Sequence, residues 1–150
     1  MSEEKKDVYS TNPDDYVLRT EIGRGAFATV YLATCVPLGK EVAIKILDLD
    51  QLDASWEEIR KEITVMGLLS HPNVVRYLCS FVVEKEIWLV MPLLAAGSCM
   101  DIMRRHYPQG YNDEILIATL LKEALKGLLY FHKDGRVHRD VKAGNIVRFM

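Results

Sequence analysis

Residues 16–48 read YVLRTEIGRGAFATVYLATCVPLGKEVAIKILD, and this stretch decides the fold class. It holds three short runs that are rich in β-branched and aromatic residues, and turns that contain glycine separate them. The runs occupy residues 16–22, 29–35 and 41–47. Because each run is short and the turns between them are tight, the stretch predicts an antiparallel meander of three strands.

Two more β-rich runs, at residues 74–83 and 86–91, predict a fourth and a fifth strand. A helix is predicted between the third and fourth strands. It begins with a capping box, in which the Ser55 hydroxyl can accept from first-turn amides while the Glu58 carboxylate reaches back to the cap. The helix is expected to run to about Leu69, because a His-Pro-Asn sequence follows. Five strands and one helix would form a compact lobe.

The composition becomes helical after Gly97. A short helix is predicted over residues 98–105 and a long one over residues 113–132. Apolar residues recur along the long helix at spacings of four and three, so that one of its faces is apolar. These residues are Ile117, Leu121, Ala124, Leu128 and Phe131. The whole pattern predicts an α+β fold, in which a complete five-stranded lobe is followed by the first helices of a helical lobe.

The bulk composition narrows the function classes. The chain has 150 residues, of which 49% are hydrophobic and 27% are charged, and this suits one globular domain. The formal net charge is -2, so no broad basic surface for nucleic acid is expected. Its apolar stretches are broken well before about 18 residues, and the start MSEEKKD is charged, so we expect a cytoplasmic protein without membrane insertion. The cysteines Cys35, Cys79 and Cys99 form no Cys-x-x-Cys pair and are expected to be reduced.

The first candidate for chemistry is the turn at residues 22–30, which lies between two predicted strands. A glycine turn that opened a helix would indicate a dinucleotide fold, whereas a hairpin turn can lie over a nucleotide and offer backbone amides to its phosphates. Gly23 and Gly25 permit close approach of the backbone, and Ala28 stands at the position of a third glycine. Val30 is placed to cover a flat base. By itself the pattern is equally compatible with a plain glycine hairpin.

Lys45, at the end of the apolar run 42–44, is the second candidate. A strand lysine usually points to solvent. The predicted helix changes this interpretation, because at about 100° per residue Glu62 falls inside its apolar arc. An unpaired carboxylate is costly to bury, so Glu62 needs a cation, and Lys45 can provide it. Such a pair behind a glycine loop holds the α- and β-phosphates of a nucleotide in kinases; the alternative is a glutamate whose carboxylate reaches solvent.

The most specific segment is residues 138–145, which read His-Arg-Asp-Val-Lys-Ala-Gly-Asn. Asp140 can accept the proton of an attacking hydroxyl, and Lys142 can hold the phosphoryl group that is transferred. Asn145 offers an oxygen to Mg²⁺. Four polar residue types at fixed spacing, in the right order after the other two motifs, predict phosphoryl transfer.

With these motifs, the sequence from Tyr16 to Ile146 resembles the protein kinases. Lys142 follows Asp140 by two positions, as is usual for serine/threonine kinases, so the resemblance implies protein substrates with Ser or Thr acceptors. It implies ATP and Mg²⁺ as cofactors, and a hinge from Pro92 to Leu94 that binds adenine through backbone groups. The residues expected to bind ATP are Ile22, Gly23, Arg24, Gly25, Ala26, Phe27, Ala28, Thr29, Val30, Ala43, Lys45, Met91, Pro92 and Leu94, with Met91 guarding the pocket behind the hinge. Those expected to act in catalysis are Asp140, Lys142, Lys45 and Glu62, with Asn145 as the second Mg²⁺ ligand.

Within the kinases, the sequence resembles the Sterile-20-like group, and most closely its oxidative-stress-responsive, Fray-type branch. The residues behind this finer resemblance lie at 12–16, 81–83, 88–92, 97–99, 117–119 and 140–146. The branch implies substrates linked to ion transport or stress, and activation by an upstream kinase. Arg139, beside Asp140, implies control through phosphorylation of an activation loop.

The resemblance also divides the chain and shows where it departs from the family. The expected parts are a flexible lead-in at 1–15 and a partial kinase domain at 16–150, with an N-lobe at about 16–91, a hinge at about 92–97 and a C-lobe at 98–150. No Asp-Phe-Gly segment, which supplies the main Mg²⁺ aspartate of a kinase, follows Asn145. These 150 residues alone are therefore expected to have little or no phosphotransfer activity. Three interpretations stay open: a shortened form of an active kinase, a non-catalytic fragment that binds a nucleotide or a kinase, and an unstable product without function.

Overall fold

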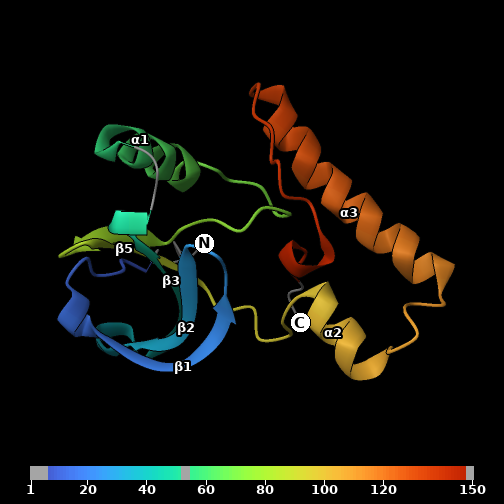
Figure 1. Ribbon diagram of the computed structural model, residues 1–150, viewed down its shortest axis with the longest axis horizontal. Coiled ribbons are helices and arrows are strands. Elements are labelled where there is room, and N and C mark those ends of the chain that lie inside the picture. The colour runs from blue at the N-terminus through green and yellow to red at the C-terminus, as the bar shows by residue number, and fades with distance from the viewer. Residues whose placement is uncertain (1–6, 52–54, 148–150) are drawn as a thin grey trace, which may run out of the picture. The chain divides into compact units, whose positions relative to one another are not determined.

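The computed structural model describes residues 7–51 and 55–147, except for the side chain of Glu62. Its contacts divide the chain into two compact units, and each is described by itself (Figure 1). The sheet unit takes in the chain up to Leu69 and the segment Arg76–Leu93. The helical unit takes in the segment Ser70–Val75 and the chain from Leu94 onward.

The described part of the sheet unit is built on five antiparallel strands in the order β1-β2-β3-β5-β4. The strands are β1 (Tyr16–Arg24), β2 (Ala28–Cys35), β3 (Lys40–Asp48), β4 (Cys79–Val83) and β5 (Glu86–Pro92). The first three form the predicted meander. β5 pairs with β3, which places β4 at the edge of the sheet. With the helices described below, this sheet confirms the predicted α+β class.

The prediction of a strand over residues 74–83 was wrong for its first five residues, because β4 begins at Cys79. Val74 instead closes a turn, in which its amide donates to the His71 carbonyl at 3.1 Å. Hydrogen bonding to β5 starts only one residue before β4, at Leu78. Valines raise the strand propensity of a segment, but a strand also needs a neighbour that satisfies its backbone groups.

The two faces of β3 carry different side chains. Val42 and Ile44 are 1% and 0% exposed and lie in a core cluster with Val90 of β5. Ala43 and Lys45 alternate with them along the strand, so their side chains point to the opposite face of the sheet. The face that carries Lys45 is thus separate from this core cluster.

Helix α1 (Trp56–Gly67) packs on the face of the sheet that carries Lys45 (Figure 1). Ile59 of the helix is 8% exposed and lies in a second core cluster with Ile87 and Leu89 of β5. Leu89 lies directly opposite Lys45 in the register of β5 with β3, so both side chains lie on this face.

The predicted capping box of α1 is confirmed. The Ser55 hydroxyl accepts from the Glu58 amide, and the Glu58 carboxylate accepts from the Ser55 amide at 2.9 Å. The helix ends at Gly67, two residues before the predicted end at Leu69. Its last amide bonds, such as that of Leu68, tighten to the 3₁₀ pattern, which is how many helices end.

The helical unit contains α2 (Cys99–His106) and α3 (Glu114–Lys133), close to the two predicted helices. Both begin at side-chain caps. Ser98 and Asp101 form a capping box at α2, in which the Ser98 hydroxyl donates to the Asp101 carboxylate at 2.6 Å. The Asp113 carboxylate accepts from two amides in the first turn of α3.

The predicted apolar face of α3 is only partly right. Phe131 is 9% exposed, but Leu121 is 53% exposed. The helix is apolar on two sides, and the side that packs is turned toward Glu123 and Gly127, which receive the segment Ser70–Val75. When both sides of a helix are apolar, the periodicity alone does not say which side packs.

The described part of the lead-in contacts the sheet. The carbonyl of Ser10 accepts from the Tyr16 hydroxyl at 2.6 Å and from the Cys79 thiol at 3.3 Å. Asp7 forms an ion pair with Lys40. The predicted flexibility of the lead-in concerns motion, and it stays a prediction.

Short elements complete the described chain. The 3₁₀ helices are η1 (Pro13–Asp15), η2 (Val36–Leu38), η3 (Leu49–Gln51) and η4 (Ala143–Asn145). The cysteines Cys35, Cys79 and Cys99 are free thiols, as predicted. Among residues 7–51 and 55–147, no helix is long and apolar enough to cross a membrane.

Candidate functional site

The glycine turn connects β1 and β2, which pair with each other up to the turn. The Gly25 amide donates to the Ala28 carbonyl at 2.8 Å and closes the hairpin. Gly23 lies opposite Val30 in the register. The turn therefore presents backbone amides at the end of a two-stranded ribbon, an arrangement that a phosphate group can bind.

The local backbone does not require glycine at positions 23 and 25. Neither residue has a φ in the left-handed region. A Cβ at Gly23 would lie 3.7 Å from the Val30 side chain, and a Cβ at Gly25 would lie 3.6 Å from the Ala28 carbonyl oxygen. These are ordinary van der Waals distances, so the fold itself tolerates a side chain at both positions. What the missing side chains provide is space for a ligand on the turn.

The side chains around the turn are exposed. Ile22 and Phe27 are 50% and 56% exposed, so their apolar surfaces are open to a flat ligand. Arg24 is already paired, since its Nε donates to the Glu21 carboxylate at 2.9 Å. This hydrogen bond lowers the pKa of the Glu21 carboxyl.

Lys45 lies within the sheet, between two neighbouring strands. It is opposite Val30 of β2 on one side and Leu89 of β5 on the other. Ala43, two residues earlier, lies opposite Met91. Side chains two residues apart on a strand share a face, so these five residues line the face on which α1 packs. Lys45 is half-buried there, a position that favours an anionic partner for its ammonium group.

The predicted pair of Lys45 with Glu62 stays a prediction, because the Glu62 side chain lies outside the described residues. The structure does describe the helix that carries it. Ile63, the next residue of α1, packs against the cluster that contains Ile59 and Leu89. The backbone of α1 is therefore held on the face that carries Lys45.

The predicted hinge begins where β5 ends. Met91 and Pro92 are the last residues of β5 and pair with β3. In the helical unit, the Leu94 carbonyl accepts from the Gly97 amide at 3.0 Å. Gly97 has a φ of 76°, in the left-handed region that favours glycine, and it turns the chain into α2.

The helical unit brings Asp140, Lys142 and Asn145 into one cluster. Lys142 Nζ lies 2.9 Å from Asp140 Oδ2. The Asn145 side-chain amide donates to the same oxygen at 2.9 Å and to the Asp140 backbone carbonyl at 2.8 Å. The side chains of Lys142 and Asp140 are 55% and 61% exposed, so the cluster is open to a ligand.

These contacts keep the Asp140 carboxylate ionised and oriented. Hydrogen bonds from Lys142, and then from Asn145, lower the pKa of its carboxyl group. Both bonds reach Oδ2, which leaves Oδ1 to accept from an incoming hydroxyl. Arg139, the preceding residue, has a φ of 63°, a strained conformation for a residue with a side chain. Such strain persists only where the surrounding contacts hold it.

Residues outside the predicted set hold this loop in place. The His138 ring meets Phe131 edge-on with centroids 5.9 Å apart, and His138 Nδ1 accepts from the Asp140 amide at 3.3 Å. The Cys99 amide donates to the Ile146 carbonyl at 2.7 Å and ties the end of the loop to α2. Sequence reasoning missed Phe131 and Cys99 in this role, because contacts between distant segments leave no pattern in a single sequence.

The predicted metal ligand is Asn145. It uses Nδ2 for both bonds to Asp140, which leaves Oδ1 as an oxygen that a cation can bind. Within the part of the chain that the structure describes, no group of three His, Cys, Asp or Glu side chains could hold a metal ion.

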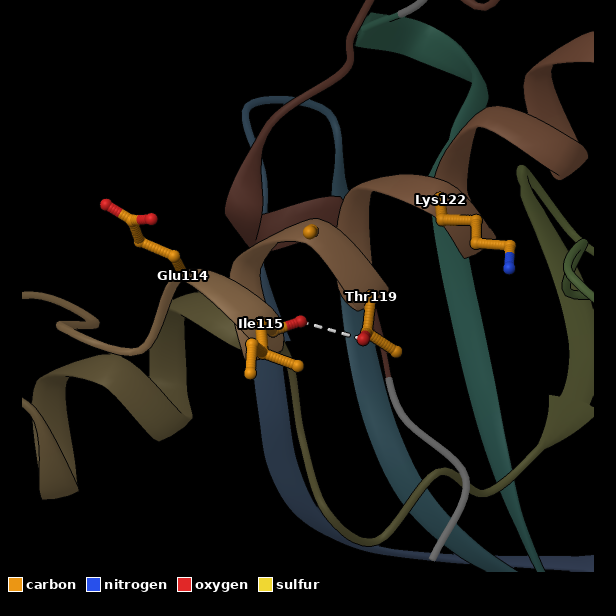
Figure 2. A pocket seen from close by; sticks show the side chains of 5 residues that line it. Glu114, Ile115, Thr119 and Lys122 are labelled. Carbon is orange, nitrogen blue, oxygen red and sulfur yellow. Dashed lines mark hydrogen bonds between the residues drawn. The ribbon is translucent and has the colours of Figure 1, made fainter.

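A shallow hollow on α3 lies apart from these residues. Figure 2 shows that its lining comes from a single helix, and the Thr119 hydroxyl donates to the Ile115 carbonyl there at 2.7 Å. Its lining residues are Glu114, Ile115, Ala118, Thr119 and Lys122. None of the sequence-predicted site residues lines it. The hollow therefore has no part in the candidate site.

Comparison with known proteins covers both groups of site residues. The model of the protein kinase domain matches residues 16–148. The chain is 52% identical over 140 residues to serine/threonine-protein kinase fray2 of Dictyostelium discoideum, which covers 93% of the chain and 14% of that protein. It is 46% identical over 149 residues to germinal center kinase 3 of Caenorhabditis elegans, covering 94% and 25%. It is 42% identical over 140 residues to serine/threonine-protein kinase fray1 of Dictyostelium discoideum, covering 93% and 24%.

These comparisons confirm the resemblance to Fray-type serine/threonine kinases. The chain spans between a seventh and a quarter of the length of these curated relatives. The matched residues run from the first residue of β1 to the strand-like end of the catalytic loop, so they include the glycine turn, Lys45 and the Asp140 cluster. This chain belongs to the protein kinase family.

Proposed function

We propose that this chain is the ATP-binding part of a serine/threonine protein kinase, which transfers the γ-phosphoryl group of ATP to Ser and Thr hydroxyls of proteins. The observation that carries the proposal is the hydrogen-bonded cluster of Asp140, Lys142 and Asn145 in a chain of the kinase family. The cluster combines a base, a cation and an amide oxygen. Phosphoryl transfer to a hydroxyl uses all three in the catalytic loop.

Asp140 would orient the acceptor hydroxyl and take its proton. Its lowered pKa makes the carboxylate a weak base, so it first accepts a hydrogen bond and takes the proton as the new O–P bond forms. Lys142 would neutralise charge on the phosphoryl group during transfer. Its ammonium group already lies beside Asp140, so the base and the cation act at the same place.

The sheet unit would hold the phosphates of the nucleotide. Backbone amides of the turn at Gly23 and Gly25 would bind them from one side. Lys45 would pair with the α- and β-phosphates while Glu62 holds its ammonium group. The half-buried position of Lys45 on the face covered by α1 supports this role.

Adenine would bind to the same face. Val30 and Ala43 lie on it, each opposite a neighbour in the sheet, and they would cover the base with apolar side chains. Met91 would close the back of the pocket. The backbone of residues 92–94 would supply hydrogen bonds to the edge of the base.

Mg²⁺ would enter with ATP. In nucleotide sites this ion is bound by one or two protein side chains together with phosphate oxygens. Asn145 Oδ1 fits one position of such a site, because the two bonds to Asp140 use the amide nitrogen. When bound, Mg²⁺ neutralises the charge that develops on the transferred phosphoryl group.

Nucleotide binding tests the proposal directly. In the presence of Mg²⁺ the 150-residue chain should bind the fluorescent analogue mant-ATP, and Lys45→Met should weaken binding by about tenfold or more, since hydrogen bonds to a charged group are lost. Lys40→Met is the matched control, because Lys40 lies on the same strand at a position of opposite parity, and its side chain is exposed. Equal affinities of the two variants would contradict the proposal.

Phosphotransfer by these 150 residues alone is proposed to be weak. No Asp-Phe-Gly sequence follows Asn145, so the charge on the phosphoryl group would be poorly neutralised. The measurement is transfer from radiolabelled ATP to casein. Mg²⁺-dependent transfer that Asp140→Ala abolishes would contradict this part of the proposal. Activation by an upstream kinase, substrates linked to ion transport or stress, and a cytoplasmic location belong to the same proposal through the Fray-type resemblance.

A second candidate is a non-catalytic fragment that binds a nucleotide or docks to a kinase. It is favoured by the exposed side of α3, where Leu121, Leu125 and Leu129 are 53%, 61% and 56% exposed. The chain should then form a stable complex with a full-length Sterile-20-like kinase. The complex should persist in Lys45→Met and be lost in Leu125→Glu. Sedimentation of the mixed proteins distinguishes the two candidates.

A further inference from the structure

The segment Ser70–Val75 interrupts the sheet unit and is bound by the helical unit. Only Leu68 and Leu69 separate it from α1. The face of α3 that receives it carries Glu123, Gly127 and Tyr130. Their spacings of four and three residues place them on one side of the helix.

Polar and ring contacts bind this segment. The Asn73 side-chain amide donates to Glu123 Oε2 at 2.9 Å, and the Ser70 amide donates to the Tyr130 hydroxyl at 3.1 Å. His71 stacks on the Tyr130 ring with centroids 5.0 Å apart. Its Nδ1 accepts from the Asn73 amide at 3.0 Å, which fixes the shape of the turn.

Gly127 is fitted to this contact by having no side chain. It is buried, and a Cβ there would lie 2.8 Å from the Asn73 carbonyl oxygen, a distance that real Cβ atoms essentially never show. Glycine is a poor helix former, and here it lies within a helix of 20 residues. The close approach of the Asn73 backbone accounts for a glycine at this position.

We propose that Gly127 and Glu123 are positioning residues, which hold Asn73 and thereby fix the C-terminal turn of α1. The consequence for catalysis rests on the proposed function, in which Glu62 of the same helix holds Lys45. The chain between α1 and the bound segment is too short to absorb a displacement, and Leu69 within it is 3% exposed. A shift of the Asn73 backbone would therefore be transmitted to the end of α1.

Hydrogen exchange of the 150-residue chain, read by mass spectrometry, tests the proposal. In Gly127→Ala the Asn73 backbone must move, so amides in residues 64–74 should exchange about threefold to tenfold faster, as expected for weakening one hydrogen bond. Gly67→Ala is the matched control, because a Cβ there meets open space. It should leave exchange in residues 70–74 unchanged. Faster exchange confined to residues 70–74 of Gly127→Ala would overturn the proposal, as would no change.

Glu123 variants give the same answer without crowding the helix. Glu123→Ala removes the acceptor for Asn73, whereas Glu123→Gln keeps an oxygen in that place. Lys126→Ala removes the other partner of Glu123, whose Oε1 lies 2.6 Å from Lys126 Nζ. Exchange at the end of α1 should rise in Glu123→Ala and return toward the wild-type rate in Glu123→Gln. A rise in Lys126→Ala equal to that in Glu123→Ala would overturn the role of the Asn73 bond.

Mant-ATP binding separates this inference from the proposed function. Gly127→Ala and Glu123→Ala should bind mant-ATP about threefold or more weakly, and Glu123→Gln should bind as the wild type does. Faster exchange together with unchanged affinity would overturn the positioning role. A wild-type chain that binds no mant-ATP would contradict the proposed function, and the exchange rates would still decide whether α3 fixes the end of α1.

Discussion

Asn145 donates its side-chain amide both to the backbone carbonyl of Asp140, at 2.8 Å, and to its carboxylate, at 2.9 Å. The two bonds close the intervening residues into a ring, so the carboxylate cannot rotate freely without losing one of them. Lys142 reaches the same carboxylate oxygen. The direction of the Asp140 side chain is therefore set before any substrate binds, which lowers the cost of reorganisation during a reaction.

The pKa of Asp140 should rise when Lys142 is replaced by Met, because the Lys142 hydrogen bond is the largest cause of its lowered pKa. A lowered folded-state pKa means that the ionised group stabilises the fold above its unfolded pKa of about 3.9. That stabilisation is lost as the pH falls through the folded-state pKa. A carbon-13 NMR titration of the Asp140 carboxyl should give a midpoint nearer about 3.9 in Lys142→Met. Lys133→Met is the control, and equal midpoints in the wild type and Lys142→Met would refute the effect.

Gly23→Ala and Gly25→Ala should weaken nucleotide binding while the fold is kept. The distances of 3.7 and 3.6 Å at the added Cβ atoms are ordinary, so the free energy of unfolding should change by less than about 0.5 kcal/mol. Gly135→Ala should instead cost about 1 kcal/mol or more, because its φ is 70°. Thermal unfolding and mant-ATP titration measure the two effects separately. Wild-type affinity in Gly23→Ala and Gly25→Ala would favour the plain hairpin interpretation.

Local signals made most elements of the sheet unit predictable. The meander over residues 16–48 follows from short apolar runs and glycine turns, and the start of α1 follows from the capping box of Ser55 and Glu58. Prediction failed where a distant partner decides the structure. Residues 74–78 are apolar enough for a strand, but the first two belong to the segment that α3 binds. Leu121 fits the apolar periodicity of α3, yet the opposite partner lies on another side.

For the candidate site, the sequence supplied the residue identities and the structure supplied their contacts. The spacing of Asp140, Lys142 and Asn145 predicts their chemistry, but it does not reveal that all three meet at one carboxylate oxygen. The support of the loop by Phe131 and Cys99 depends on the fold of the helical unit, and no spacing rule brings these residues together. Tertiary contacts of this kind are outside the reach of periodicity and motif arguments.

Tyr16 should remain protonated until the protein unfolds in alkali. Its hydroxyl donates to the Ser10 carbonyl at 2.6 Å, and burial, followed by the hydrogen bond with Cys79, raises its pKa. A raised folded-state pKa means that its contribution to stability is complete below the unfolded value of about 10 and is lost as the pH rises above it. Tyrosinate absorbance followed against pH should show Tyr16 ionising together with unfolding. Tyr16→Phe should remove that tyrosinate from the unfolding step and keep the ring stacked on Phe81; a smooth titration of Tyr16 near about 10 in the folded protein would refute the prediction.

Removing the two serine caps should have unequal costs. Ser55 and Ser98 form the same kind of capping box, but Ser98 is 7% exposed whereas Ser55 is exposed. Ser98→Ala would take a 2.6 Å hydrogen bond from the partly buried Asp101 carboxylate. We therefore expect Ser98→Ala to cost about 2 kcal/mol and Ser55→Ala about 1 kcal/mol, both within the range for N-caps. Because the caps belong to different units, hydrogen exchange in α1 and in α2 measures each cost separately, and equal costs would contradict the argument from burial.

The Ser98 cap should also affect the catalytic loop. Cys99 follows the cap directly, and its amide holds the Ile146 carbonyl at the end of that loop. If the first turn of α2 loosens in Ser98→Ala, this bond loosens with it, and exchange of the Cys99 amide itself should accelerate by about tenfold, since one hydrogen bond and its cap are weakened. Ser80→Ala, at an exposed position of β4, is the control and should leave that amide unchanged. Unchanged protection of the Cys99 amide in Ser98→Ala would mean that the loop, and not the cap, holds the start of α2.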